Sequence, residues 1–178
     1  SPSRISSFFG RINYGYNDKY LATVTLRADG SSKFAKGNRW GFFPAGALAW
    51  RISNEDFLKD NQVVSNLKLR VSYGTSGNDR IDADLYQKLY GVSSSRPAGW
   101  GENSHYYYNF YNSKYVYNPD VRWETTITRN IGFDFGFFKE RISGTVDVYW
   151  NTVKDLLVPS DIPGYTGYTK LMTNVGQT

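Results

Sequence analysis

The alternation of apolar and polar side chains in residues 130–150 constrains the fold more than any other feature of this sequence. On each side of the short segment FKER, most second residues are apolar, which is the two-residue period of a β-strand and not the 3.6-residue period of a helix. The apolar set consists of Ile131, Phe133, Phe135, Phe137, Ile142, Val146, Val148 and Trp150. The residues between them are mainly glycine, serine, threonine, aspartate and asparagine. This segment therefore predicts a hairpin with one apolar and one polar face.

The same alternation recurs about six times along the chain, in segments separated by connections of very different length. Short connections (NDK and KER) alternate with long ones, which we expect near residues 29–39, 76–120 and 158–170. The strand-like segments run for roughly ten to fifteen residues, which suits tilted membrane-spanning strands of at least ~9–11 residues. The sequence predicts an all-β fold, an antiparallel meander of long strands with short turns at one end and long loops at the other. We expect it to form part of a large transmembrane β-barrel.

Composition excludes several other classes. The 178 residues contain no run approaching the ~18 consecutive apolar residues of a spanning helix, which excludes a helical membrane protein. There is no cysteine, and hence no disulfide framework or thiolate metal site. The net charge is +5, but the basic residues are scattered, so nucleic acid is not an expected partner. The aromatic fraction of 17% suits a sheet-rich interface or a membrane-interface belt.

Residues that could carry chemistry are sparse. His105 is the single histidine, and a lone loop histidine indicates neither a metal site nor a catalytic base. Asp134 and Asp147 fall on the polar faces of neighbouring strands and could form an acid–base pair, but nothing marks a cleft around them, which favours ordinary lumen-facing groups. The string YGTSGN opens no helix and lacks the Lys-Ser/Thr end of a phosphate-binding loop. We expect no enzyme, no cofactor and no metal.

An aromatic tract occupies residues 100–117, inside the longest loop. Its rings can stack on sugars or pack on peptide side chains while their polar atoms form hydrogen bonds. The ligand-binding candidates are Trp100, Tyr106, Tyr107, Tyr108 and Tyr111. The commoner alternative is that these rings pack the loop against itself and against a partner protein.

The alternation also assigns side chains to the two faces of a barrel wall. The residues predicted to face lipid are Ile131, Phe133, Phe135, Val146, Val148 and Trp150. The residues predicted to face the lumen are Arg27, Arg51, Arg70, Asp134, Thr145, Asp147 and Asn151. The residues predicted to form an interfacial girdle near strand ends are Trp40, Trp50, Trp123 and Trp150. Arg129 interrupts the apolar face, and because arginine costs about 2–4 kcal/mol at the bilayer midplane and about zero to one near the interface, we expect it near the outer boundary.

Three strings carry a family resemblance. They are RINYGYNDKYLATVTLRADGSSKFAKGNRWGFFPAGALAWRISNEDFL, NLKLRVSYGTSGN and NPDVRWETTITRNIGFDFGFFKERISGTVDVYWNTVKDLL. Together they resemble the barrel of SusC/RagA-family outer-membrane receptors, the TonB-dependent importers of Bacteroidetes-type bacteria. The resemblance covers most of the chain from about residue 10. It is weakest across residues 76–118.

The resemblance implies a location in the bacterial outer membrane and several partners. A full member carries an N-terminal plug inside a 22-stranded barrel, a segment that contacts TonB, and a SusD-like lipoprotein over the extracellular mouth. We expect the plug domain to be absent from this chain, and about six strands cannot close such a barrel, so we interpret the chain as a piece of a larger polypeptide. Its expected neighbours are the rest of the barrel, the plug, the lipoprotein and outer-membrane lipid.

The leading hypothesis is therefore a fragment of the wall and mouth of a TonB-dependent transporter for a nutrient, either glycan or peptide. Two alternatives stay open at this point. One is a soluble β-sandwich that binds carbohydrate, in which a second sheet would cover the apolar face. The other is the wall of a passive porin, which strand physics alone does not distinguish from a receptor wall.

Overall fold

In the computed structural model of the chain, the described residues are 3–82, 85, 87, 90–100, 105–112 and 115–178, with the backbone alone described for 90–100 and 105–112. The strands are β1 (Ile5–Tyr16), β2 (Tyr20–Ser31), β3 (Trp40–Arg51), β4 (Val64–Asn78), β5 (Tyr90–Trp100), β6 (His105–Asn112), β7 (Tyr115–Val116), β8 (Glu124–Phe137), β9 (Ile142–Asp161) and β10 (Lys170–Gln177). Two 3₁₀ turns, η1 (Ile52–Asn54) and η2 (Gly164–Thr166), complete the assignment. Among the described residues, no helix is long and apolar enough to cross a membrane.

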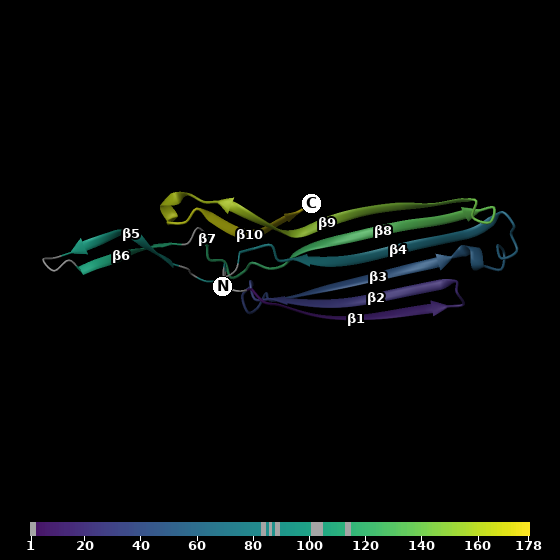
Figure 1. Cartoon of the computed structure of the whole chain (residues 1–178), viewed down its shortest axis with the longest axis horizontal. Coiled ribbons are helices and arrows are strands. Elements are labelled where there is room, and N and C mark those ends of the chain that lie inside the picture. The colour runs from purple at the N-terminus through teal and green to yellow at the C-terminus, as the bar shows by residue number, and fades with distance from the viewer. Residues whose placement is uncertain (1–2, 83–84, 86, 88–89, 101–104, 113–114) are drawn as a thin grey trace.

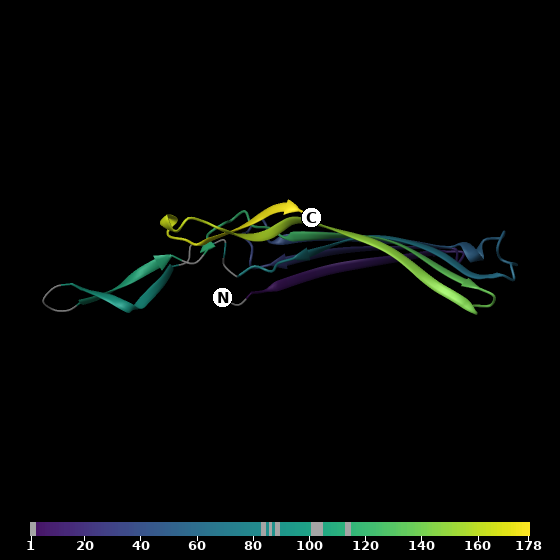
Figure 2. The ribbon, with the colours of Figure 1, turned by 90° about the horizontal axis from the view of Figure 1, so that it is seen from above.

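The long strands form a single curved sheet. Its order is β1-β2-β3-β4-β8-β9-β10-β7, with antiparallel pairing throughout except between β10 and β7. The connections from β1 to β2, from β3 to β4 and from β8 to β9 lie together at one end of the sheet, and we call this the turn end (Figure 1). The other connections lie at the opposite end, the loop end, beyond which the β5–β6 hairpin projects (Figure 2). The predicted antiparallel meander, with short turns at one end and long loops at the other, is confirmed.

The tight turns follow from local chemistry. Between β1 and β2, Asn17 and Asp18 adopt positive φ angles of 49° and 50°, a conformation that asparagine and aspartate tolerate better than most residues. Between β8 and β9, three successive residues beginning at Phe138 also have positive φ. The Ser65 hydroxyl supports this second turn by accepting hydrogen bonds from the backbone N–H groups of Lys139 (2.7 Å) and Glu140 (3.3 Å).

One expectation about strand positions needs correction. The tract 76–120 is not one long loop, because β4 continues to Asn78 and the tract also contains β5, β6 and β7. Tyrosine, serine and asparagine occur there at both parities, so no apolar face was visible in the sequence. Pro44 lies in the unbroken ladder between β2 and β3, opposite Leu26. Pairing with β4 begins only at Ala45, so the missing N–H of the proline leaves no gap on that side.

All of the described buried apolar side chains except that of Ile127 form one cluster at the loop end, and we call this group the loop-end core. It consists of Phe34, Phe43, Ile81, Leu85, Val121, Trp123 and Met172, with Tyr115 and Leu157 packed against it. The Trp123 ring lies 5.3 Å from that of Phe34 and 5.6 Å from that of Phe43, measured between centroids. With 8% of its surface exposed, Trp123 belongs to this core, so its assignment to an interfacial girdle was wrong.

Candidate functional site

The register of the sheet separates an apolar from a polar face. One row of paired positions runs from Val24 through Gly46, Tyr73 and Arg129 to Trp150, and it lies on the same face as the predicted lipid-facing residues. Large apolar side chains on this face are exposed, including Val148 at 58%. The register places all the predicted lipid-facing residues on this face: Ile131, Phe133, Phe135, Val146, Val148 and Trp150. That this face meets lipid stays a prediction.

The other face carries the predicted lumen residues. The register places Arg27, Arg51, Arg70, Asp134, Thr145, Asp147 and Asn151 together on it, on strands β2, β3, β4, β8 and β9. Near the loop end, Arg27 Nε donates to both carboxylate oxygens of Asp29, at 2.9 and 2.8 Å. This face therefore carries charged groups at the centre of the sheet and toward both of its ends, as the interior wall of a barrel does.

An ion network joins three strands at the centre of the polar face. Arg70 on β4 binds Asp134 on β8 with two hydrogen bonds, Nε to Oδ2 at 3.0 Å and Nη2 to Oδ1 at 2.9 Å. The same Nη2 reaches Asp147 on β9, with Oδ1 at 3.3 Å. Thr145 Oγ1 donates to Asp134 Oδ1 at 3.0 Å. Bidentate pairing fixes the planar guanidinium more firmly than a single contact would.

Gly132 makes this network possible. It lies on β8 directly between Arg70 and Asp147 in the register. A Cβ at this position would come within 2.5 Å of Asp147 Oδ1 and 2.8 Å of Arg70 Nη2. The arginine therefore crosses β8 over a residue that has no side chain. Nothing in the local sequence distinguishes Gly132 from the other strand glycines, and only the register identifies its role.

The network also bears on the role of the two aspartates. Both carboxylates share one guanidinium, which is an ion-pair arrangement and favours the interpretation of Asp134 and Asp147 as ordinary polar groups of the face. Within the part of the chain that the structure describes, there is no group of three or more His, Cys, Asp or Glu side chains that could hold a metal ion.

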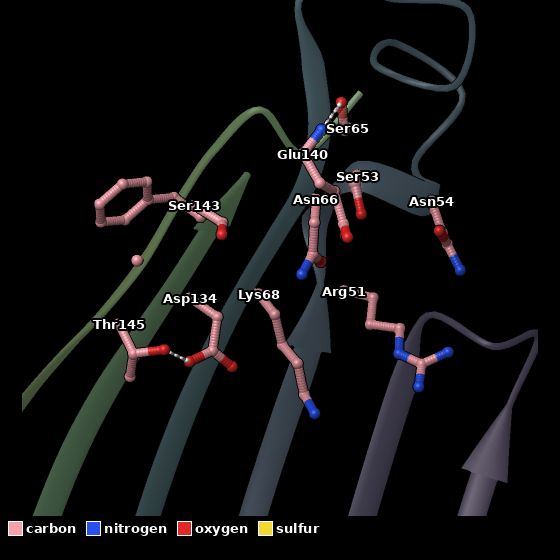
Figure 3. A pocket seen from close by; sticks show the side chains of 12 residues that line it. Arg51, Ser53, Asn54, Ser65, Asn66, Lys68, Asp134, Glu140, Ser143 and Thr145 are labelled. Carbon is pink, nitrogen blue, oxygen red and sulfur yellow. Dashed lines mark hydrogen bonds between the residues drawn. The ribbon is translucent and has the colours of Figure 1, made fainter. Parts of the chain in front are cut away.

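Next to this network, toward the turn end, lies an open polar hollow of about 710 Å³. Figure 3 shows Arg51, Lys68 and Asp134 side by side on β3, β4 and β8, with Asn66 and Glu140 nearer the turns. Asp134 is engaged by Arg70. Among the described residues, Arg51 and Lys68 have no carboxylate within ion-pair distance, so two cationic groups face the hollow.

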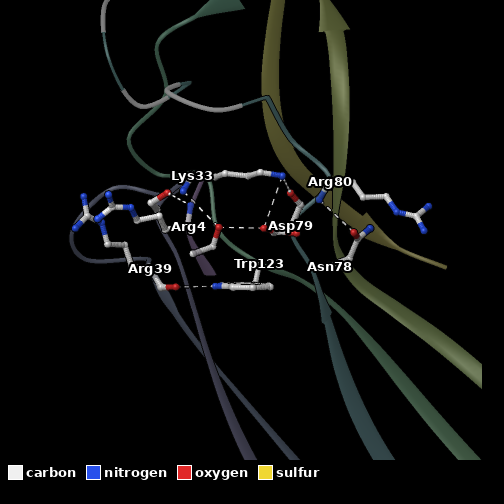
Figure 4. A network of polar contacts seen from close by, with 9 residues as sticks. Arg4, Lys33, Arg39, Asn78, Asp79, Arg80 and Trp123 are labelled. Carbon is white, nitrogen blue, oxygen red and sulfur yellow. Dashed lines mark hydrogen bonds and ion pairs between the residues drawn. The ribbon is translucent and has the colours of Figure 1, made fainter. Parts of the chain in front are cut away.

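A second polar network ties the loops together at the loop end (Figure 4). Ser31 Oγ donates to Asp79 Oδ2 at 3.0 Å, and Lys33 Nζ donates to the backbone oxygen of Asp79 at 3.0 Å. Trp123 Nε1 donates to the backbone oxygen of Arg39 at 3.0 Å. Segments that are far apart in sequence are thus joined by hydrogen bonds at the loop end, which the sequence alone did not reveal.

The predicted ligand-binding residues lie on the β5–β6 hairpin, which projects beyond the loop end (Figure 1). The backbone pairs Trp100 with His105 and Tyr111 with Gly91. The side chains of the candidates Trp100, Tyr106, Tyr107, Tyr108 and Tyr111, and of His105, lie outside the described part of the structure. Their role stays a prediction.

At the turn end, Glu55 collects three donors. Its carboxylate accepts hydrogen bonds from Tyr20 Oη (2.8 Å), Trp50 Nε1 (3.0 Å) and Lys19 Nζ (3.2 Å). These bonds, that of Trp50 first, hold the pKa of Glu55 below its ordinary value, and the Glu55 hydrogen bond raises the pKa of Lys19. The contact fixes the segment after β3 to the β1–β2 turn. Sequence analysis missed this cluster because it joins positions more than thirty residues apart.

A long-stranded antiparallel sheet with an exposed apolar face, a charged opposite face and loops collected at one end is the wall of an outer-membrane β-barrel. A family model described as "TonB dependent receptor-like, beta-barrel" matches residues 1–178. The chain belongs to this family of outer-membrane receptors.

Relatives at the level of sequence agree. The chain is 44% identical to the TonB-dependent receptor SusC of Bacteroides thetaiotaomicron over 173 residues, which cover 96% of this chain and 17% of the relative. It is 39% identical to the TonB-dependent receptor P39 of Formosa agariphila over 175 residues, which cover 97% of this chain and 16% of the relative. The chain thus spans about a sixth of the length of these receptors.

Solved structures give the same result. A structure described as the RagAB peptide transporter superimposes with a TM-score of 0.83 at 31% identity, over 98% of this chain and 18% of that one. The siderophore receptor PirA from Pseudomonas aeruginosa matches with a TM-score of 0.57 at 14% identity, over 98% of this chain and 29% of that one, and this likeness concerns the fold alone. The predicted resemblance to SusC/RagA receptors and the outer-membrane location are confirmed.

Proposed function

We propose that this chain forms part of the wall and mouth of an energised outer-membrane transporter that takes up a nutrient, either glycan or peptide, together with a SusD-like lipoprotein. The family match over the whole chain supports a receptor over a passive porin. One solved relative is described as a peptide transporter, so the peptide class has a precedent among similar proteins. The chain acts as wall and capture surface and carries out no chemical reaction.

The observation that carries this proposal is the pair of contrasting faces on one sheet. Neighbouring positions on β9 illustrate it: Val148 is 58% exposed on the apolar face, whereas Asp147 on the polar face is bound to Arg70. A soluble sandwich would need a second layer over the apolar face. In the part of the chain that is described, no second sheet covers it.

The polar face would give the plug of the full-length receptor a place to dock. Arg51 and Lys68, which face the hollow near the turn end, suit acidic groups on a lumen-filling domain of the full-length receptor. In the Arg70 network beside them, one arginine is paired with two carboxylates, so the network carries a net charge of −1 and holds three strands together. TonB would then act on the plug, and this chain would have no direct contact with it.

An arginine scan of two adjacent positions tests the membrane assignment in the full-length receptor. Val148 lies about 15 Å above the β8–β9 turn along the membrane normal, near the middle of the ~25 Å apolar band, given a rise of roughly 3.3 Å per residue and a tilt of about 40°. Val148→Arg should cost about 2–4 kcal/mol and reduce the heat-modifiable, membrane-assembled fraction. Tyr149→Arg, on the polar face, is the matched control and should assemble like the wild type. Equal assembly of the two variants would remove the basis of the proposal.

Growth of a deletion strain tests the transport role and the cargo. A strain that lacks the full-length gene, and the same strain with the gene restored, are compared on defined glycans and on defined oligopeptides as limiting nutrients. Loss of growth on one class, restored by the gene, supports uptake of that class. Unchanged growth and unchanged uptake of labelled glycans and peptides would contradict the transport role.

A further inference from the structure

Arg129 is a cation placed on the apolar face. It is paired across the sheet with Tyr73 on β4 and Trp150 on β9. Its guanidinium carbon lies 5.9 Å from the centroid of the Tyr73 ring, and its Nη1 donates to Thr152 Oγ1 at 3.2 Å. Thr152 pairs with Ile127, which is nearer the loop end than Arg129 is. The side chain is therefore held by an aromatic ring and a hydroxyl, and it is directed toward the loop end.

The charge of Arg129 is not neutralised by the chain. Among the described residues, none of the ion pairs involves Arg129. Thr152 and Tyr73 satisfy part of its hydrogen-bonding and electrostatic demand without cancelling its charge. A guanidinium with several unused N–H donors on an outward face suits an anionic ligand with oxygen acceptors.

The height of Arg129 puts its backbone about 5 Å below the upper boundary of the proposed apolar band, within reach of the headgroups for a side chain directed toward the loop end. The segment from Arg129 to the end of β8 at Phe137 covers about 20 Å of the ~25 Å apolar band, with the same rise and tilt as above. The cost of an outward-facing arginine falls toward zero at that level. Trp150 and Tyr73 flank it, at 45% and 46% exposure, and amphipathic rings of this kind prefer the membrane interface.

A second cation lies on the same face. Lys154 on β9 is exposed and is paired with Thr125. Going toward the loop end along β9, it is the next position after Thr152 on this face. It too takes part in none of the ion pairs among the described residues. The adjacent Asp155 does not neutralise Lys154, because its Oδ1 lies 3.5 Å from Arg122 Nη2 and pairs with that residue.

We propose that Arg129 and Lys154 form a binding site for the phosphate of a lipid headgroup in the outer leaflet. Arg129, steered by Thr152 and Tyr73, supplies paired N–H donors at the level where acyl chains end, and Lys154 supplies a second charge above it. The lipid tails lie along the exposed apolar residues below, including Ile131 and Val148. The inference rests on the proposed contact of the apolar face with lipid. It adds a specific preference for one headgroup chemistry.

Binding of two lipids that differ only in the phosphate tests the site. The full-length receptor, purified in detergent and stripped of lipid, is titrated with dioleoyl phosphatidic acid or with dioleoylglycerol, and bound lipid is counted by native mass spectrometry. Since each basic residue near a lipid surface contributes about fivefold to the binding of anionic lipid, Lys154→Gln or Arg129→Gln should weaken phosphatidic acid binding about fivefold and the double variant about thirtyfold. Dioleoylglycerol binding should not change.

Controls separate the possible outcomes. Arg11→Gln removes the same charge from the polar face and should leave phosphatidic acid binding unchanged. If Arg129→Gln fails to assemble, Arg129→Lys replaces it, because lysine keeps the charge. Lys154→Gln alters only an exposed side chain and should assemble normally. Competition by inorganic phosphate at equal concentration should be weak, because the tails contribute to binding, and strong competition would indicate a free-phosphate site and overturn the proposal.

Failure of this inference differs from failure of the lipid-facing assignment. If both lipids bind equally and the substitutions have no effect, the apolar face meets lipid but the phosphate site is wrong. If neither lipid binds and Val148→Arg assembles normally, the assignment of the face itself is wrong. An equal loss of phosphatidic acid binding in Arg11→Gln would show a general charge effect and would also contradict the site.

Discussion

Removing the indole of Trp123 should loosen the loop end and leave the wall assembled. The ring is 8% exposed, packs on Phe34 and Phe43, and donates a hydrogen bond to Arg39 O. Truncation of a buried tryptophan to alanine typically costs about 3–5 kcal/mol. If that cost falls on local opening of the loop-end core, the open population rises by roughly two to three and a half orders of magnitude.

Hydrogen exchange of the full-length receptor measures this opening directly. In Trp123→Ala, amides in residues 115–123 and 29–39 should exchange far faster than in the wild type, whereas those of β8 and β9 below the loop end should keep their protection. Trp123→Phe, which keeps most of the ring packing and loses the hydrogen bond to Arg39, should show a small fraction of the effect. Unchanged exchange in Trp123→Ala, or equal loss of protection throughout β8 and β9, would refute the description of the loop-end core as a unit that opens separately from the strands.

Three further substitutions test other parts of the sheet in the full-length receptor. Gly77→Ala should raise the rate of amide hydrogen exchange at the loop end, because the added Cβ would overlap the Phe43 ring. The loop end should also unfold at a lower temperature than in the wild type. Gly132→Ala should push Arg70 away from its neighbour on β9 with a loss of at most about 1 kcal/mol, seen as a small drop in the denaturation midpoint, since that pair is partly exposed. Because hydrogen bonds lower the pKa of Glu55 below its ordinary 4.5, their stabilising contribution is complete above that value and is lost as the pH falls through the lower folded pKa. The fluorescence of Trp50 should change as acid breaks its hydrogen bond to Glu55. This acid-induced change should be absent in Glu55→Gln.

The wall could be predicted from the sequence because one physical signal specifies it. Alternation with period two records which face of each strand meets which environment, and it survives wherever the two environments differ. Residues such as Val146 and Asp147 were therefore assigned to opposite faces without any knowledge of pairing, and the register places them so. The β5–β6 hairpin was missed because tyrosine and polar residues occur at both parities along it, which gives no contrast between faces.

Contacts between distant strands could not be predicted, because they depend on the register. The pairing that brings Arg70, Gly132 and Asp147 into one row is fixed only when three strands are aligned. Trp123 shows the opposite error. Its place just before a long strand fits an interfacial girdle, yet the loop that precedes it returns over the sheet and buries the ring. Position along a strand predicts burial only where nothing folds back over it.

The two ends of the sheet are stabilised in different ways, because their connections differ in length. Between them, one face carries exposed apolar side chains and the other carries paired charges, so the wall has no apolar core of its own and relies on its backbone ladder. At the turn end, short connections need only a few hydrogen bonds, such as those to Glu55 and Ser65. At the loop end, connections too long to be fixed by turn chemistry are held by a small core like that of a soluble domain. Apolar-to-apolar substitutions should therefore be tolerated on the predicted lipid-facing side of the strands and poorly tolerated around Trp123, because lipid would adapt to a changed side-chain shape and a close-packed core does not.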